Sequence, residues 1–287
     1  MLIAVLLRAT DLRAQVDPLT GVVTHDARLA ALSPADQAAL EHALVLAEAW
    51  GARVLALSAG GPEADGPLRE VIALGPEVRR VDLPLAYLDD LVCDERALAK
   101  ALVSALGDDR PDLVLCGDRS ADRGTGALPA FVAHELGVVQ APGLVSLGLE
   151  GDDLVAERRL DHGRRERMRV PLPAVCSVEA SGVRLRRAGL SASLAAADAA
   201  IPVVPAVLPA TAVRVVQARP SRPRPRHLPP PTGTARERLL ALTGALLSHD
   251  PPTIVGPVEA AEAADVLLEF LAKHGYLSEA RTGWKAL

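Results

Sequence analysis

The chain has 287 residues, of which 49% are hydrophobic and 23% are charged, so it can bury a full core without disulfides or metal ions. Its 31 basic and 36 acidic residues give a formal net charge of −5, which disfavours general binding to nucleic acid or to an anionic membrane surface. Aromatic residues make up 2% of the chain, too few for the stacking platforms that bind single-stranded nucleic acid.

The cysteines and the N-terminus indicate a compartment. Cys93, Cys116 and Cys176 lie far apart in the sequence, a pattern typical of reduced core thiols rather than of a disulfide framework or a metal site. The opening residues MLIAVLLRATD carry neither a basic leader nor a small-residue cleavage site, and no apolar run approaches the roughly 18 residues of a membrane span. We therefore expect a cytoplasmic protein with no signal peptide and no membrane insertion.

Short apolar runs alternate with helical patterns over the first 137 residues. Continuous apolar runs of this length are typical of strands that are buried on both faces. The predicted strands are 2–7, 53–58, 78–84 and 112–116, and the predicted helices are 34–50, 69–74, 95–106 and 127–137. Because such alternation gives a parallel sheet with helices on both faces, we predict an α/β fold with an open, mostly parallel sheet.

The first predicted helix has a clear start and end. Ser33 is a good N-cap, Pro34 suits the first helical position, and Asp36 completes the pattern of a capping box. The helical spacing of apolar residues ends at Gly51. Upstream of this helix, residues 14–23 predict a small hairpin with its turn at 18–21.

The pattern changes after residue 143. Residues 144–161 and 165–179 predict antiparallel strands, joined by turns at Gly151 and at 162–163. We expect these strands to be an antiparallel addition to the parallel sheet.

The last third of the sequence resembles an extended arm more than a core. An alanine-rich helix within 184–200 is followed by a proline- and arginine-rich segment, 218–231, and by amphipathic helices at 235–248 and 259–273. We therefore divide the chain into a nucleotide-binding α/β domain, 1–200, and a C-terminal linker and helical arm, 201–287. Apolar stripes on an arm predict contact with a partner subunit.

One loop carries the strongest signal for a ligand. In an open parallel sheet, ligands bind beyond the carboxyl ends of the strands, and the loop 117–126 leaves such an end and finishes with Gly124-Thr125-Gly126 before a predicted helix. Glycines admit backbone N–H groups close to phosphate oxygens, and a helix N-terminus attracts anions. Arg119, Arg123 and the Thr125 hydroxyl add charge and a hydrogen bond. We predict that this loop holds a nucleotide phosphate, with an ordinary strand-to-helix loop as the alternative.

Signatures of catalysis are missing. The sequence has no GxGxxG after the first strand, no GxxxxGK[ST] and no GxSxG elbow. Asp118 and Asp122 fit acid–base groups, turn caps or acceptors for a ribose, and we favour the ribose. The segment 58–61 is only a weak match to a pyrophosphatase-type loop. We therefore expect a nucleotide that is bound without being converted, and no metal site.

Many short motifs occur in a characteristic order and spacing. They are IAV (3–5), TGVV (20–23), SPADQAALEHALVLAE (33–48), LSAGGP (57–62), VLCG…D…TG (114–126), AERRLDHG (156–163), LPAV (172–175), RRAGLSASLAAA (186–197) and DPPTIVG…EAADVLLEFL (250–271). Through these motifs the chain resembles the β subunits of electron transfer flavoproteins, over roughly residues 1–200 and again near its end.

The resemblance implies an adenine-nucleotide-binding α/β domain that forms a heterodimer with an α subunit. The α subunit holds most of the redox-active FAD, while the β subunit contributes a wall near the flavin and binds AMP. In bifurcating relatives a second FAD takes the place of the AMP. Carried over to this sequence, the family's nucleotide site comprises Ala4, Ser33, Pro34, Ala35, Asp36, Ala59, Cys116, Gly117, Asp118, Arg119, Ser120, Asp122, Gly124, Thr125 and Gly126.

The same resemblance implies a docking site. Leu190 occupies the place of the family's recognition-loop leucine, which anchors partner dehydrogenases, and Arg186 lies just before it. The chain departs from the family in five places. Ser33 replaces an asparagine, the loop after Gly117 is short, residues 8–13 lack a tyrosine, and the residues after Leu190 are alanine-rich instead of basic. The proline- and arginine-rich linker and the helix 235–248 are extra. These departures indicate a divergent subfamily with a dedicated partner, similar to the members associated with the mycofactocin system.

Two functions from different classes follow. The first is an electron carrier subunit without catalytic residues of its own, which passes electrons from a dehydrogenase through FAD to a quinone reductase or an equivalent acceptor. The alternative is a stand-alone adenine-nucleotide-binding regulator resembling universal stress proteins. A hydrolase or transferase acting on an adenylate would need an acid–base pair, which the sequence does not supply.

Overall fold

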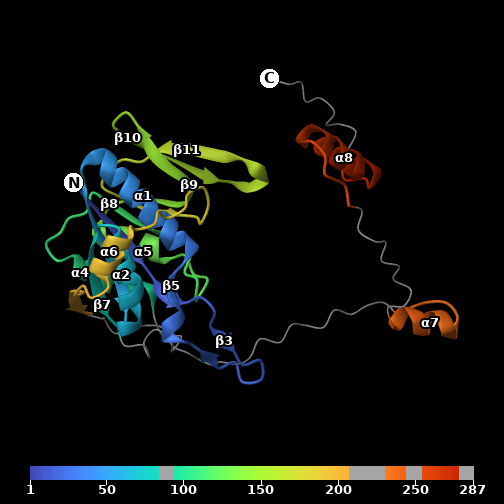
Figure 1. The fold of residues 1–287 in the computed structure, drawn as a ribbon, viewed down its shortest axis with the longest axis horizontal. Coiled ribbons are helices and arrows are strands. Elements are labelled where there is room, and N and C mark those ends of the chain that lie inside the picture. Colours follow the sequence, from blue (N-terminus) through green and yellow to red (C-terminus); the bar gives the residue numbers. More distant parts are fainter. Residues whose placement is uncertain (84–93, 207–229, 244–253, 278–287) are drawn as a thin grey trace. The chain divides into compact units, whose positions relative to one another are not determined.

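The computed structural model describes residues 1–83, 94–206, 230–243 and 254–277. Its contacts divide the chain into two units, Met1–Arg222 and Pro223–Leu287. The first unit contains an α/β domain (Figure 1). In the second unit, the described elements are α7 (Ala235–Leu242) and α8 (Ala260–Lys273). The predicted helix 259–273 is confirmed; the end of the predicted helix 235–248, most of the segment 218–231, and Cys93 lie outside the described residues.

A nine-stranded sheet organises the described part of the first unit, in the order β11-β10-β9-β12-β8-β1-β6-β7-β13. The neighbouring strands in the series β9-β12-β8-β1-β6-β7-β13 pair in parallel. In the series β11-β10-β9, the neighbours pair antiparallel. The bounds are β1 (Leu2–Leu7), β6 (Arg53–Gly60), β7 (Glu77–Asp82), β8 (Leu113–Gly117), β9 (Val139–Glu150), β10 (Asp153–Arg159), β11 (Arg165–Arg169), β12 (Ala174–Val178) and β13 (Val203–Pro205). The predicted α/β fold with an open, mostly parallel sheet is confirmed.

Helices cover both faces of the parallel strands. The helices are α1 (Pro34–Trp50), α2 (Asp65–Ala73), α4 (Glu95–Leu106), α5 (Leu128–Leu136) and the short α6 (Leu190–Ala196). Side chains of β1 alternate between two cores: Ile3 and Val5 pack with α1 and α2, whereas Leu2 and Leu6 pack with α4 and α5. Every residue of β1 is buried, which explains its continuous apolar sequence.

The start of α1 follows the sequence signals. Ser33 caps the helix by accepting a hydrogen bond from the Asp36 N–H at 3.1 Å, and Pro34 stands at the first helical position. The helix ends at Gly51, whose φ of 62° lies in the left-handed region that favours glycine. Two short strand pairs precede α1: β2 (Ala9–Asp11) with β5 (Ala30–Leu32), and the predicted hairpin, β3 (Gln15–Val16) with β4 (Val23–Thr24).

The prediction of antiparallel strands throughout 144–179 is partly wrong. β9, β10 and β11 form the antiparallel ribbon, with turns at Gly151 and at 162–163 as predicted. In contrast, β12 lies between β8 and β9 and runs parallel to both. The reason lies in Pro171 and Pro173, which have no N–H to donate and end the ribbon. The fully buried run of β12 then behaves as an interior parallel strand.

Other boundaries differ by a few residues. β6 continues through Gly60, beyond the predicted end at 58, and α2 begins at Asp65 instead of 69. The chain also adds β13, which pairs in parallel with β7 at the edge of the sheet. This strand was not predicted because it has only three residues, too few to show a pattern.

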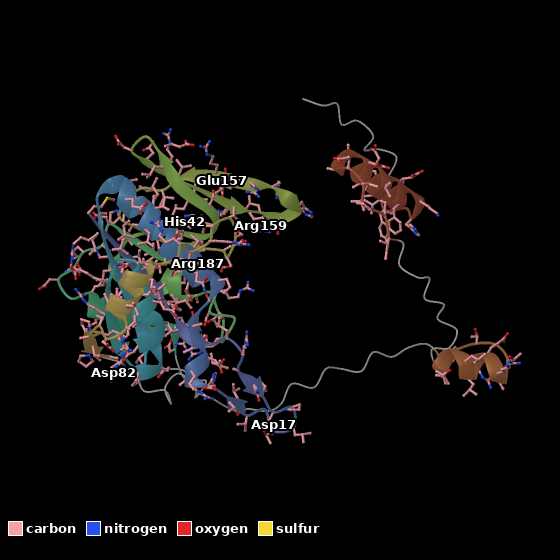
Figure 2. The ribbon with its side chains drawn as sticks, in the orientation of Figure 1. Asp17, His42, Asp82, Glu157, Arg159 and Arg187 are labelled. Atoms are coloured by element: carbon pink, nitrogen blue, oxygen red, sulfur yellow. The ribbon has the colours of Figure 1, made fainter. Side chains whose placement is uncertain are left out.

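The antiparallel ribbon carries charges on its exposed face. Figure 2 shows Glu157 and Arg159 on β10, where Arg159 pairs with Glu179 at 2.6 Å and Glu157 pairs with Arg165 of β11 at 3.5 Å. The edge strand of the sheet, β11, has the sequence RERMR, and charged side chains on an edge strand oppose pairing with another chain. The ribbon therefore extends the sheet without exposing an apolar edge.

The strand order reverses at β1. The chain passes from β1 through α1 to β6 on one side, and returns from β7 through α4 to β8 on the other side of β1. The connections at the carboxyl ends of β1 and β8 therefore leave toward opposite faces of the sheet. In folds of this kind, a crevice for ligands forms at such a point.

Candidate nucleotide-binding site

A pocket lies at the carboxyl ends of β1, β6 and β8. The space between its atoms is about 650 Å³, a figure that includes open solvent. Its lining combines an apolar side from the strands, α4 and α5 with charged groups from the loop after β8. The lining residues are 6–8, Asp36, Ala59, Glu95, Leu98, Leu102, 116–120, Arg123, Thr125, Gly126, Leu128 and Pro129.

The structure brings most of the predicted nucleotide-site residues to this pocket. Those that line it are Asp36, Ala59, Cys116, Gly117, Asp118, Arg119, Ser120, Thr125 and Gly126. The other predicted residues lie outside the lining: Ala4, Ser33, Pro34, Ala35, Asp122 and Gly124. Ala4 is buried against α4 and α5, whereas Ser33 and Asp122 reach the site through hydrogen bonds to lining residues. Which of these residues bind a nucleotide stays a prediction.

Asp36, in the first turn of α1, lies between the ends of β1 and β8. Its carboxylate accepts hydrogen bonds from the Ser33 hydroxyl at 2.8 Å and from the backbone N–H groups of Arg8 and Gly117. Burial raises the pKa of Asp36 to about 6, although these hydrogen bonds act to lower it. Asp36 therefore ties together the two strand ends at which the strand order reverses.

Two glycines of the site leave little room for a side chain. A Cβ atom at Gly117 would lie 3.0 Å from both the Ala35 Cβ and the Asp36 carboxylate, a tight contact. At Gly126, a Cβ atom would lie 2.7 Å from the Asp118 carbonyl oxygen, a contact with backbone that cannot move aside cheaply. Glycine at Gly126 therefore allows the loop after β8 to fold closely on itself.

An ion pair that the sequence reasoning missed fastens the loop to β1. The Arg8 guanidinium donates to the Asp122 carboxylate, with Nε at 2.9 Å, and the Ser120 hydroxyl donates to the same carboxylate. Burial acts to raise the pKa of Asp122, but the Arg8 charge and these hydrogen bonds hold it below its ordinary value. Arg8 follows β1 directly, and this position at a strand end could have marked it as a site residue. The position does not reveal that its partner is Asp122.

The loop between β8 and α5 is held by its own backbone. The Ser120 N–H donates to the Thr125 carbonyl at 2.8 Å, and the Asp118 N–H donates to the Val178 carbonyl of β12 at 2.9 Å. Burial and the nearby Glu179 raise the pKa of Asp118. At the end of the loop, no side chain caps the N-terminus of α5, and Pro129 at its second position has no N–H. An anion there would meet the N–H groups of Leu128 and Ala130 and the partial positive charge of the helix.

Glu95 is the second site residue that the sequence reasoning missed. It is the first residue of α4, lines the pocket, and accepts a hydrogen bond from the Thr125 hydroxyl. Its other oxygen, Oε2, is buried and has no hydrogen-bond partner among the described residues. The Thr125 hydroxyl, which the sequence assigned to a phosphate, is therefore directed at a carboxylate in this structure.

The predicted docking residues lie away from the pocket. Leu190 begins α6, and its side chain is 76% exposed, so it is not a core residue of this chain. Arg186 donates to Glu41 through its backbone N–H at 2.9 Å and through its guanidinium, and it also pairs with Glu48. Burial acts to raise the pKa of Glu41, but the Arg186 hydrogen bonds bring it below its ordinary value. Arg186 thus fastens the segment before Leu190 to α1.

Comparison with known proteins identifies the family of the chain. A family model for the electron transfer flavoprotein domain matches residues 20–209, which span the pocket loop and α6. The chain belongs to the electron transfer flavoprotein β-subunit family. The same match bears out the resemblance that the sequence motifs indicated.

Individual relatives of this electron transfer flavoprotein chain are distant. The β subunit of Thermoanaerobacterium thermosaccharolyticum is 30% identical over 149 residues, which cover 52% of this chain and 56% of the relative. The β subunit of Syntrophomonas wolfei is 26% identical over 208 residues, covering 72% and 80%. Protein FixA of Azorhizobium caulinodans is 28% identical over 194 residues, covering 65% and 68%. The match with the first of these thus spans little more than half of that relative's length.

Two further properties concern the described parts of this electron transfer flavoprotein chain. No group of three or more His, Cys, Asp or Glu residues there is arranged to hold a metal ion. No helix in the described segments is both long and apolar enough to cross a membrane. Helices α7 and α8 lie beyond the region matched by the family model.

Proposed function

We propose that this chain is the β subunit of a heterodimeric electron transfer flavoprotein. In this role it passes electrons from a dehydrogenase through FAD held mainly by an α subunit, and it binds AMP as a structural nucleotide. The observation that carries the proposal is the pocket at the reversal of strand order in a chain of this family. The chain itself contributes binding and orientation, because the flavin supplies the redox chemistry.

The pocket residues fit an adenine nucleotide. The uncapped N-terminus of α5 and the lining Arg119 and Arg123 suit a phosphate. Leu98, Leu102 and other apolar lining residues suit the faces of a purine. Gly126, which lacks room for a Cβ atom, brings the loop backbone close to the pocket. These features support a mononucleotide that is bound and not converted.

The flavin is assigned mainly to the α subunit. FAD accepts and releases electrons when bound, and this chain would provide one wall beside it. In this proposal, one adenine nucleotide occupies the pocket at the strand ends. The residues of this chain take no direct part in proton or electron transfer in this proposal.

Two exposed regions support the proposed partners. Leu190 and Leu194 of α6 are exposed apolar side chains beside arginines, an arrangement suited to docking an electron-donating dehydrogenase. Helix α8 exposes Leu267, Leu268 and Phe270, which supports contact of the arm with the α subunit. Truncation after residue 217 is expected to leave the α/β domain folded and to abolish co-purification with the α subunit. A truncated chain that still co-purifies at full yield contradicts this assignment.

The cysteines bear on the compartment. Cys116 and Cys176 are buried free thiols, and burial raises the pKa of both. Such thiols are stable in a reducing compartment, which supports a cytoplasmic protein.

Co-expression with an electron transfer flavoprotein α subunit tests the proposal. The expected product is a yellow heterodimer whose flavin is reduced by a cognate dehydrogenase and reoxidised by an electron acceptor. Purification of the chain as a stable, colourless monomer that does not bind the α subunit would contradict it.

A further inference from the structure

One carboxylate oxygen of Glu95, Oε2, lacks a hydrogen-bond donor in the part of the chain that the structure describes. Glu95 Oε1 accepts from the Thr125 hydroxyl, while Oε2 is buried and has no partner among the described residues. A buried carboxylate oxygen without a donor is costly, more so than a neutral acceptor. Because Glu95 lines the nucleotide pocket, a ligand in that pocket is well placed to provide the donor.

Several neighbouring donors of the protein are already engaged. The Arg8 guanidinium and the Ser120 hydroxyl both donate to Asp122, and the Ser120 N–H donates to the Thr125 carbonyl. The Thr125 hydroxyl is used by the other oxygen of Glu95 itself. The same hydrogen bond orients the Glu95 carboxylate, since it joins the start of α4 to the end of the pocket loop.

The chemistry of a nucleotide narrows the choice of donor. A phosphate at neutral pH offers a negative charge, which the Glu95 carboxylate repels, and it offers few protons. A ribose offers two adjacent hydroxyls, which a carboxylate accepts well, as in the acidic residue that binds the ribose of dinucleotides. Thr125 places Glu95 beside the loop that suits the phosphate, and the ribose lies closer to the phosphate than the amino group of the base does.

We propose that Glu95, oriented by Thr125, accepts a hydrogen bond from a ribose hydroxyl of the bound adenine nucleotide and makes the pocket selective for ribonucleotides over deoxyribonucleotides. This inference rests on the proposed function of the pocket. It assigns specificity to a residue of α4, outside the loop 117–126 and the other segments that the sequence pointed to.

A competition experiment tests the assignment. The full-length protein with its α subunit is unfolded in urea, dialysed free of nucleotide, and refolded with an equimolar mixture of AMP, 2′-deoxyadenosine monophosphate and 3′-deoxyadenosine monophosphate. Retained nucleotides are then measured by liquid chromatography and mass spectrometry. The wild type is expected to retain AMP over at least one deoxynucleotide by about tenfold or more, the loss expected for one hydrogen bond to a charged group.

Three variants complete the design. Glu95→Ala is expected to lose the preference for AMP while still retaining adenine nucleotides. Glu95→Gln keeps an acceptor oxygen without the charge and is expected to show an intermediate preference. Glu70→Ala removes an exposed carboxylate of α2 that does not line the pocket, and it is expected to match the wild type.

The outcomes separate this inference from the proposed function. A wild type that retains all three nucleotides equally, or a Glu95→Ala variant that keeps the full preference, overturns the role of Glu95 and leaves the nucleotide pocket standing. A wild-type complex that retains no adenine nucleotide overturns the nucleotide assignment, and the role of Glu95 with it.

Discussion

Replacing Asp36 with asparagine is expected to stabilise the protein at neutral pH. The Asp36 side chain is 7% exposed, and burial raises its pKa from 3.8 to about 6. Asparagine occupies nearly the same volume, stays neutral, keeps one acceptor oxygen, and has an NH₂ group that can donate to the Ser33 hydroxyl oxygen. The Asp36→Asn variant therefore removes the cost of a buried charge while leaving a polar group of the same shape in its place.

The size of the effect follows from the pKa. A rise from 3.8 to about 6 corresponds to roughly 3 kcal/mol, at about 1.4 kcal/mol for each tenfold change in proton affinity. Because the folded-state pKa is raised, the stability that the protonated carboxyl contributes is fully present below pH 3.8 and is lost as pH rises through 6. Wild type and variant should therefore be similar near pH 4 and differ by up to roughly 3 kcal/mol at pH 7.5.

Urea unfolding between pH 4 and pH 8, followed by circular dichroism, measures the difference directly. The Asp152→Asn variant is the matched control, because it removes the same charge from the exposed turn between β9 and β10. A gap between wild type and Asp36→Asn that stays constant across this range would refute the reasoning. So would a variant that is less stable than the wild type at pH 7.5.

Three further predictions follow from the same contacts. Leu190→Ala should leave the melting temperature nearly unchanged, because the side chain is exposed, and should slow flavin reduction by the donor dehydrogenase; a lower melting temperature with an unchanged rate contradicts docking. Burial lowers the pKa of His42, so the stability that neutral His42 contributes is lost as pH falls below 6.5, and the free energy of unfolding of His42→Gln in urea should rise relative to that of the wild type over this range. A double-mutant cycle with Arg8→Ala and Asp122→Ala should give a coupling of about 0.5–3 kcal/mol; additive effects contradict the ion pair.

Local sequence signals were sufficient for the parallel strands β1, β6, β7 and β8 and for the helices between them. β1 is buried on both faces, so its sequence is apolar throughout, and α1 begins and ends where Ser33 and Gly51 predict. Both elements are specified by residues that are adjacent in the chain. The order of capping residues and apolar runs was therefore enough to place the loops that form the pocket.

The other features could not be predicted because they depend on contacts between residues that are far apart in the sequence. The direction of β12 is set by its pairing with β8 and β9. Its five buried residues are equally compatible with a parallel and an antiparallel strand. Within the site, Arg8 and Asp122 are 114 residues apart, and Glu95 and Thr125 are 30 residues apart. Such pairs form only when loops from different strands meet, and a single sequence does not reveal which loops do so.

The nucleotide content of the purified heterodimer tests the central claim most directly. After denaturation, chromatography and mass spectrometry should find one AMP for each FAD in the wild type. Gly126→Ala should retain much less AMP, because its Cβ would lie 2.7 Å from the Asp118 carbonyl oxygen, while Gly66→Ala, at a place with open space, should retain it fully. A wild-type complex without an adenine nucleotide beyond its FAD, or a Gly126→Ala complex with its AMP intact, would contradict the account.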